Sequence, residues 1–248
     1  MGYSVILPTL NEAGHIVKLI EKINFNFLEI KEEFEIILVD DNSTDGTIDL
    51  LETAAKDYEN VYFFLRKGLK KNLADSINLG IQKSKYENII WMDADFQHPP
   101  DYFKFFHDYQ NKYDLIIFSR FLKNSVRYFS DERFKKESNE NQSVFFNKLC
   151  NFFLYRYIND YTSGFICIKR KILENYKLKG YYGEYFIDLI IYCKLNNYSI
   201  IELPFIERPR DSGTSKTYPG FSFRYLILLS KYFITLINNF RRKIFRYK

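Results

Sequence analysis

The 248-residue chain contains little cysteine, proline or glycine, with three, six and ten residues of each. The cysteines are odd in number, lie far apart and form no CxxC pair, which excludes a disulfide framework and predicts small core residues in a reducing compartment. So few Pro and Gly leave little room for linkers, and the sequence contains no internal repeat or low-complexity tract. These absences favour one large domain over two small ones.

The sequence also lacks an apolar run of about 18 residues, the usual requirement for a membrane span. A strand pattern begins at once, so we expect no signal peptide. The net charge of +5 is confined to residues 241–248, which hold five cations and no acid, so that residues 1–240 are neutral. This distribution argues against a nucleic-acid partner. It suits an anionic membrane surface, with a solvated, frayed terminus as the open alternative.

Short apolar runs alternate with helical patterns along the first half of the chain. We expect strands over residues 3–7, 34–39, 61–65, 88–92 and 114–118. Helices are expected between them, over residues 12–28, 47–58, 73–83 and 101–109. This alternation predicts a mostly parallel sheet flanked by helices. Polar loops at 8–12, 40–47 and 93–100 follow three of the strands, where ligands bind in such sheets.

The pattern changes beyond residue 120. We expect a mobile polar loop over 124–142, an aromatic helix over 143–158, a strand over 163–169, helices over 172–176 and 184–196, a last strand over 199–203, a loop over 208–220 and a final helix over 221–240. The final helix is apolar but carries Arg224 and Lys231, which make spanning a bilayer costly. An amphipathic helix lying in the membrane interface fits this pattern better.

Two carboxylates, Asp93 and Asp95, follow the apolar stretch 89–92 and are separated by Ala94. At the end of a parallel strand they can point at one cation, and Gln97 adds a neutral oxygen. Such oxygen ligands suit Mg²⁺ or Mn²⁺. The alternative is a solvated acidic turn. The placement of three polar loops at strand ends favours the metal site.

Six motifs, in this order, resemble the family 2 glycosyltransferases, in particular polyprenyl-phosphate sugar synthases of the dolichyl-phosphate mannose synthase type. They are LPTLNE at 7–12, VDDNSTDGT at 39–47, MDADFQHPP at 92–100, SR at 119–120, DYTSGF at 160–165 and RDSGTSK at 210–216. The resemblance covers roughly residues 4–216 and implies a GT-A, Rossmann-like α/β domain over 1–220. A C-terminal amphipathic helix with a basic tail is expected over 221–248.

The resemblance implies an inverting, metal-dependent transfer of a hexose from a nucleotide sugar, of GDP-mannose or UDP-glucose type, to a polyprenyl or dolichyl phosphate. It assigns Mg²⁺ or Mn²⁺ to Asp93, Asp95 and Gln97. The implied catalytic residues are Asp93, Asp95, Arg120 and Arg210. The implied donor-binding residues are Pro8, Leu10, Asn11, Glu12, Asp40, Asp41, Asp93, Ala94, Asp95 and Lys216. The acceptor phosphate is assigned to Arg120, Ser163, Gly164 and Arg210.

A lipid monophosphate needs no catalytic base, because its second pKa near 6 makes it an anionic nucleophile at neutral pH. Cations then have only to position it; the alternative for each cation is a surface ion pair. An alternative function, sugar transfer to a glycan or glycolipid hydroxyl in cell-surface polysaccharide synthesis, demands a base, for which Glu184 is the candidate. A non-catalytic binding or scaffold protein is disfavoured by the intact motifs at 93–95 and 210–216.

Some positions depart from the family pattern. Leu10 replaces a usual tyrosine, and Asn72 and Ala74 replace glycines, which weakens any inference about donor specificity. For Asn11, a helix cap and an anion-binding role remain equal alternatives. The basic turn that begins at Arg66 is expected to be mostly solvated. The resemblance is to short, peripheral relatives at the cytoplasmic face of a membrane, and leaves room for a membrane-protein partner.

Overall fold

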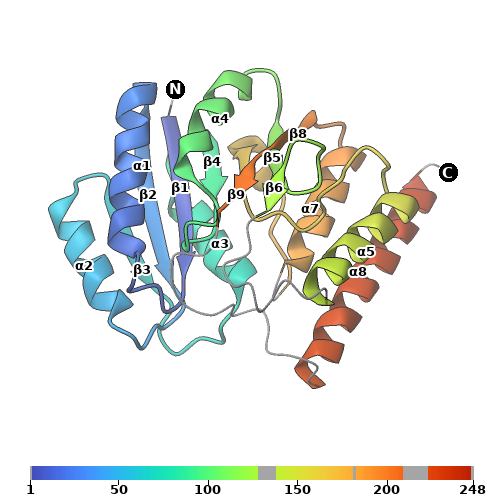
Figure 1. Ribbon diagram of the computed structural model, residues 1–248, viewed down its shortest axis with the longest axis horizontal. Helices are drawn as coiled ribbons and strands as arrows, with labels where there is room; N and C mark the ends of the chain where they lie inside the picture. Colours follow the sequence, from blue (N-terminus) through green and yellow to red (C-terminus); the bar gives the residue numbers. More distant parts are fainter. Residues whose placement is uncertain (1, 128–137, 181–182, 209–222, 247–248) are drawn as a thin grey trace.

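The computed structural model describes residues 2–127, 138–180, 183–208 and 223–246. A seven-stranded sheet in the order β3-β2-β1-β4-β7-β5-β8 lies between two layers of helices (Figure 1). Its strands are β1 (Gly2–Thr9), β2 (Glu33–Asp40), β3 (Val61–Leu65), β4 (Asn88–Trp91), β5 (Leu115–Ser119), β7 (Ile166–Lys169) and β8 (Ile200–Pro204). The predicted α/β class with a mostly parallel sheet is confirmed.

Alternate side chains along each central strand face opposite layers. In β2, Ile37 and Val39 pack with one buried cluster, whereas Ile36 and Leu38 pack with the other. One layer holds α1 (Ile16–Ile30), α2 (Thr47–Asp57) and α4 (Phe103–Tyr109). The other holds α3 (Leu73–Lys83), α5 (Ser138–Phe153), α6 (Arg170–Leu173), α7 (Glu184–Leu195) and α8 (Phe223–Arg246). Burial on both faces explains why these strands are nearly continuous apolar runs.

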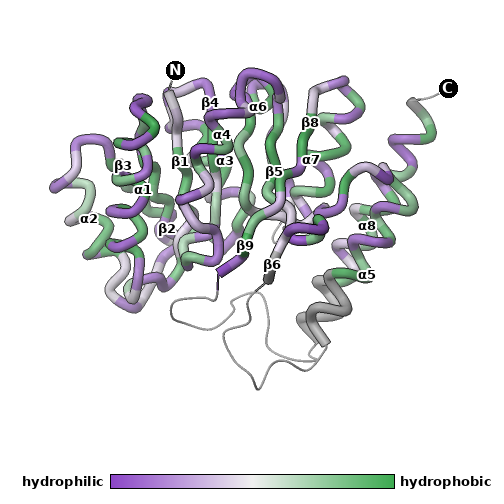
Figure 2. Tube along the Cα trace, turned by 45° about the horizontal axis from the view of Figure 1, so that its top comes forward, coloured by the Kyte–Doolittle hydropathy of each residue, from purple (hydrophilic) through white to green (hydrophobic). Residues whose placement is uncertain are grey.

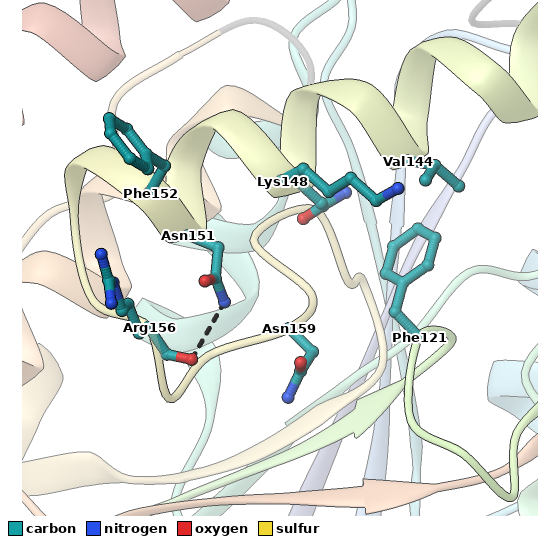
Figure 3. Close-up of a pocket in the computed structure, with 8 residues that line it drawn as sticks. Phe121, Val144, Lys148, Asn151, Phe152, Arg156 and Asn159 are labelled. Atoms are coloured by element: carbon teal, nitrogen blue, oxygen red, sulfur yellow. Dashed lines mark hydrogen bonds between the residues drawn. The ribbon is translucent and has the colours of Figure 1, made fainter.

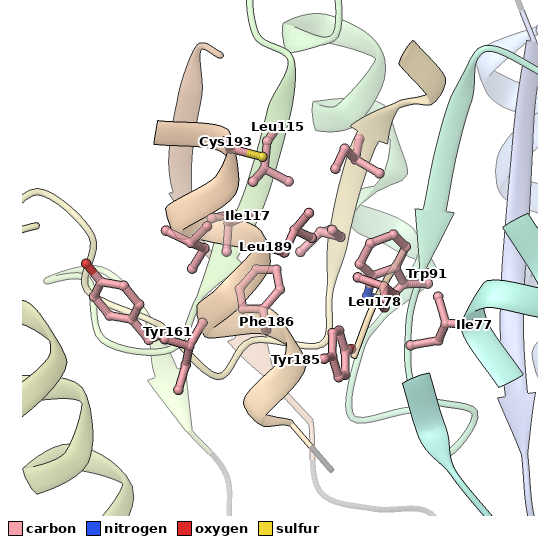
Figure 4. Close-up of a cluster of buried hydrophobic side chains, with 14 of the residues drawn as sticks. Ile77, Trp91, Leu115, Ile117, Tyr161, Leu178, Tyr185, Phe186, Leu189 and Cys193 are labelled. Carbon is pink, nitrogen blue, oxygen red and sulfur yellow. The ribbon is translucent and has the colours of Figure 1, made fainter. Parts of the chain in front are cut away.

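The cluster beneath α7 joins the two halves of the chain. Trp91 from β4 packs near Tyr185 of α7, and Phe186 and Leu189 cover β5 (Figure 4). Figure 2 shows the strands as mainly hydrophobic and the connecting loops as mainly hydrophilic. The buried cluster on this face therefore continues across the sheet from β2 to β5.

Several predicted boundaries were wrong. The first helix begins at Ile16 and not at residue 12, and β1 continues through Pro8 to Thr9, so Pro8 does not end that strand. The aromatic helix α5 ends at Phe153, five residues early, because the chain turns there towards β7. Two short strands, β6 (Val126–Arg127) and β9 (Ile206–Glu207), pair in segments that we expected to lack strands. The 3₁₀ turn Pro100–Tyr102 precedes α4.

Helix α8 packs on α5 and α7. Tyr232 contacts Phe146 edge to face at a centroid distance of 5.1 Å, and Phe240 contacts Phe153 in the same way at 5.5 Å. Arg242 forms an ion pair with Asp188 of α7. Hydrophilic and hydrophobic residues alternate along α8 (Figure 2). Among the helices that the structure describes, none is both long enough and apolar enough to cross a membrane.

Candidate active site

The loops after β1 and β2 are joined by hydrogen bonds. The backbone N–H of Asn11 donates to Ser43 Oγ at 2.7 Å, and the N–H of Thr44 donates to Asn11 Oδ1 at 2.8 Å. The N–H of Glu12 donates to Thr47 Oγ1 at 2.7 Å. Asn11 has a φ of 54°, a conformation that Asn tolerates better than most residues. Asn11 is therefore not a helix cap, because α1 begins only at Ile16, and its role in donor binding stays a prediction.

The two carboxylates after β2 have different surroundings. Asp40 is fully buried and accepts hydrogen bonds from Thr9 Oγ1 at 2.9 Å and from the N–H and hydroxyl of Ser43 at 2.7 and 2.6 Å. These bonds hold the loop in shape. Glu12, in the first loop, accepts from His15 Nε2 at 2.8 Å. Roles for Asp40 and Glu12 in donor binding stay predictions.

Asp41 is held by Arg66 and by the start of α3. The Arg66 guanidinium donates to Asp41 and to Ser76 Oγ, and the N–H of Asn72 donates to Asp41 Oδ2 at 2.7 Å. Burial raises the pKa of Asp41, while the Asn72 N–H and the Arg66 cation oppose that rise. Lys67, Lys70 and Lys71 are exposed, as expected for a mostly solvated turn, but Arg66 is buried. The reason is its pairing with a carboxylate 25 residues earlier in the chain.

The loop after β4 presents one carboxylate and buries another. The Asp93 side chain is 49% exposed, whereas Asp95 is buried and accepts from the Gln97 N–H at 3.1 Å. The N–H of Asp93 donates to His98 Nδ1 at 3.0 Å. Burial lowers the pKa of His98 to about 4, so its ring is neutral and can accept that bond. His98 thus fixes the loop that carries Asp93.

The predicted acceptor side lies directly against this loop. A Cβ added to Gly164 would lie 3.5 Å from Asp93 Oδ1 and 3.4 Å from His98 Cε1. The His98 ring also stacks on Phe165 at a centroid distance of 5.1 Å. The antiparallel pairing of β7 with β4 brings these segments together. Ser163 is buried and donates to the Phe118 carbonyl at 2.7 Å, so its hydroxyl supports the turn.

The partly buried Arg120 forms a bidentate ion pair with the fully buried Asp160. Arg120 Nε donates to Asp160 Oδ2 at 2.8 Å, and Nη2 donates to Asp160 Oδ1 and to Thr162 Oγ1, each at 2.8 Å. Burial by itself lowers the pKa of Arg120, but the Asp160 carboxylate has the stronger effect and holds that pKa above its usual value. Burial by itself raises the pKa of Asp160, but the charge and hydrogen bonds of Arg120 have the stronger combined effect, so the pKa lies below its usual value. Both groups are therefore charged at neutral pH.

Asp160 was missing from the predicted site residues. Its signal was present, because Asp160 opens the motif at 160–165 and precedes Thr162 by two residues. Glu202 of β8 accepts from the backbone N–H groups of Asn159 and Asp160, both at 2.8 Å. Glu202 thus connects Asp160, the partner of Arg120, to strand β8. This chain of contacts joins residues 40 or more positions apart, which a linear pattern does not reveal.

Other predicted residues have simpler places. Pro8 lies in β1 and pairs in register with Val39. Leu10 is partly buried, and Ala94 is buried behind the acidic loop. Arg210 and Lys216 lie outside the described residues. Across the residues that the structure describes, no group of three or more His, Cys, Asp or Glu side chains is arranged to hold a metal ion.

Residues 4–177 match the model of the family described as "Glycosyl transferase family 2". The chain belongs to this family. It is similar to a dolichol-phosphate mannosyltransferase of Pyrococcus furiosus, with 27% identity over 227 residues that make up 91% of this chain and 62% of the relative. A dolichol-phosphate mannosyltransferase of Saccharomyces cerevisiae is 25% identical over 94% of this chain and 87% of its own length. The chain thus spans less than two thirds of the Pyrococcus relative.

The fold is also that of solved glycosyltransferases. A crystal structure of glucosyl-3-phosphoglycerate synthase from Mycobacterium tuberculosis, with Mn²⁺, uridine diphosphate and phosphoglyceric acid, superposes with a TM-score of 0.67 at 15% identity. The match covers 96% of this chain and 78% of the other. At this identity the likeness concerns the fold alone. It confirms the predicted GT-A architecture of this family member.

Proposed function

We propose that this chain transfers a hexose from a nucleotide sugar to a polyprenyl phosphate, with inversion at the anomeric carbon. The observation that carries the proposal is the contact between two motifs, because Gly164 of the predicted acceptor side adjoins Asp93 of the predicted donor side. The Pyrococcus and yeast relatives are named dolichol-phosphate mannosyltransferases, which supports the acceptor class. The acceptor, the sugar and the nucleotide are parts of the proposal.

The donor side is suited to a nucleotide sugar. Asp41 lies at the end of β2 and presents a carboxylate whose position is held by Arg66 and Asn72. Asp93, Asp95 and Gln97 supply oxygen groups of the kind that Mg²⁺ or Mn²⁺ binds, so these three side chains fit such an ion as ligands. When bound, the ion would offset the charge that grows on the departing nucleoside diphosphate.

The acceptor side needs a fixed cation more than a base. A lipid phosphate oxygen attacks the anomeric carbon as the bond from that carbon to the nucleoside diphosphate breaks, and no proton has to be removed. Asp160 and Thr162 occupy Nε and Nη2 of Arg120; among the described residues no acceptor bonds its Nη1 group. We assign this Nη1 group to a phosphate oxygen. Arg210 and Lys216 are assigned to the acceptor phosphate and the donor by the resemblance alone.

The chain would act as a peripheral protein at the cytoplasmic face of a membrane. The exposed side of α8 carries large apolar side chains at Phe233, Ile234, Ile237, Ile244 and Phe245. Arg241 and Arg242 lie among them on the exposed surface. Such a helix can lie in a bilayer interface. We propose residues 1–220 as the catalytic part and 221–248 as the membrane-contacting part.

The test is direct. Purified protein with Mn²⁺ is incubated with a polyprenyl phosphate and one nucleotide sugar at a time. The molecular masses of the extracted lipids are then measured by mass spectrometry. We expect a new lipid heavier by one hexose with one of the donors. A product formed only on a glycan or glycolipid hydroxyl would contradict the proposal and make the buried Glu184 at the start of α7 the base to test.

An Asp95→Asn variant sharpens this test. The amide keeps the size of the side chain and an oxygen that can still accept from the Gln97 N–H, so the fold should persist. We expect kcat/KM to fall about 100-fold or more, as for loss of one charged group that stabilises a transition state. Mn²⁺ affinity, measured by calorimetry, should fall as well. Asp57→Asn, at the exposed end of α2, is the matched control.

A further inference from the structure

A pocket of about 490 Å³ lies between α5, the chain that follows it and the loop after β5 (Figure 3). Its apolar lining comes from Phe121, Val144 and Phe152, and its cations are Lys148 and Arg156. In Figure 3, the Lys148 side chain extends towards Val144 and Phe121, while Arg156 lies at the other end near Phe152. The volume is in the range of small-ligand sites.

The walls of the pocket are held in place by internal hydrogen bonds. Asn151 Nδ2 donates to the carbonyl oxygens of Arg156 and Ile158 at 3.1 and 2.8 Å. Asn159 Nδ2 donates to Glu202 at 2.9 Å, and Asn147 Nδ2 donates to Thr162 at 3.2 Å. These amides therefore shape the pocket. The pocket is preformed, and recognition of a ligand is left mainly to its cations and apolar surface.

The two cations have no carboxylate partner in the part of the chain that the structure describes. Neither Lys148 nor Arg156 takes part in an ion pair there. Both lie on the exposed surface, so they place two unbalanced positive charges at the edge of the pocket. A ligand that bears a phosphate or carboxylate group would complement them.

Exposed aromatic rings lie beside these cations in the sequence of α5 and the turn after it. Phe145, Phe152 and Tyr157 are 61%, 66% and 84% exposed. A free phosphate ion would engage the cations and leave these rings in water. An amphiphile would engage both, because aromatic rings are favoured where headgroups meet acyl chains. The combination favours a phospholipid as the ligand.

We propose that this pocket binds the headgroup of an anionic phospholipid. The inference rests on the proposed function, in which a lipid acceptor brings the chain to a bilayer. The pocket also adjoins the acceptor arginine, since Phe121 follows Arg120 and the guanidinium lies over its ring at 5.5 Å. Asn159 of the pocket precedes Asp160, the partner of Arg120. A headgroup bound here holds the membrane surface next to the acceptor phosphate site.

The experiment measures binding of the full chain to vesicles of phosphatidylcholine with and without phosphatidylglycerol. We expect tighter binding to the anionic vesicles. In the double variant Lys148→Ala/Arg156→Ala, the ratio of the affinities for vesicles with and without phosphatidylglycerol should fall about 30-fold, because each cation near the surface contributes a factor of about five. The matched control is Lys56→Ala/Lys104→Ala, which removes the same charge from the exposed surfaces of α2 and α4. An equal loss in both double variants would overturn the proposal.

A second variant separates a pocket from a general basic surface. Val144→Trp fills the space beside Phe121 without changing charge, and should also abolish the preference for phosphatidylglycerol. An unchanged preference in this variant, with circular dichroism like the parent, would show that the cations attract any anionic surface and that the pocket is not a site. Displacement from the vesicles by inorganic phosphate or glycerol 3-phosphate at low concentration would identify a free phosphate as the ligand instead.

The vesicle measurements do not depend on catalysis. Hexose transfer to a short-chain polyprenyl phosphate in detergent is measured on the same proteins. Lys148→Ala/Arg156→Ala should retain it within a factor of about two, because both side chains are exposed and neither is assigned to the donor or the acceptor phosphate. Transfer without a phosphatidylglycerol preference would overturn the pocket proposal alone. A phosphatidylglycerol preference without transfer would overturn the proposed function alone.

Discussion

Asp160 holds Arg120, the cation that we assign to the acceptor phosphate. It is fully buried, binds both Nε and Nη2 of Arg120, and also accepts from the backbone N–H of Arg120 at 3.1 Å. A buried ion pair adds little net stability, but removal of one partner leaves an uncompensated charge. Such a pair is well suited to fixing the direction of a guanidinium.

Asp160→Asn should therefore destabilise the protein by about 3 kcal/mol or more. The substitution should also make the free energy of unfolding depend less on pH under acidic conditions. Because the pKa of Asp160 is lowered in the folded state, its contribution is complete above the usual Asp pKa of about 4 and is lost as the pH falls below it. Urea unfolding of both proteins from pH 7 downwards measures this difference.

The stability gap between parent and variant should narrow as the solution is acidified below about pH 4. Asp49→Asn, on the exposed surface of α2, serves as the control and should unfold like the parent at neutral pH. A constant gap at all pH values would mean that the Asp160 charge does not hold Arg120. In that case the loss would reflect packing alone.

At the scale of elements, the loops after β1 and β2 act as one unit. Ser43 accepts from the Asn11 N–H and donates to Asp40, so one hydroxyl connects both loops. The motifs place these loops at the same edge of the sheet, and that prediction was confirmed. Their mutual hydrogen bonds could not be predicted, because they join residues 32 positions apart.

Ser43→Ala tests this unit. It leaves the Asn11 N–H and the buried Asp40 carboxylate each without one partner, and should cost about 2 kcal/mol. If the paired loops form the donor site, KM for the nucleotide sugar should rise more than kcat falls. Thr53→Ala, which removes a hydroxyl bonded within α2, is the control. An unchanged KM in a destabilised variant would separate the loops from donor binding.

At the scale of the whole molecule, α8 presents one face to the domain and another to the surroundings. Leu236 and Asn239 are buried, whereas Ile234 and Ile237 are 57% and 51% exposed. The buried face packs on α5 and α7, so α8 and the sheet form one body at this contact. The exposed apolar side chains of α8 are suited to contact with a membrane interface.

Ile234→Asp/Ile237→Asp should keep the fold and weaken binding to neutral and anionic vesicles alike, by about tenfold or more, because each Ile buried in an apolar phase is worth about 1.5–3 kcal/mol. Leu28→Asp, at an apolar residue of α1 that is 72% exposed, should bind as the parent does. Equal weakening in Leu28→Asp, or none in the α8 variant, would exclude α8 as the contact surface. Co-sedimentation with vesicles is the measurement.

The sequence by itself determined the alternation of strands and helices, the α/β class and the polar loops at strand ends. These follow from local periodicity and from side-chain type, which act within a few residues. Most of the predicted elements therefore appear, with boundaries shifted by a few residues at Ile16 and Phe153. The family motifs also follow from local order alone.

Only the tertiary structure decided which of these residues meet. The antiparallel insertion of β7 beside β4 places Gly164 against Asp93. Asp41 holds Arg66 in the interior, and Asp160 fixes the guanidinium of Arg120. The two ion pairs join residues 25 and 40 positions apart, and the pairing of β4 with β7 joins residues still further apart in the sequence. Their free energy comes from burial in the folded core, where a carboxylate and a guanidinium must be paired, and linear patterns do not contain that information.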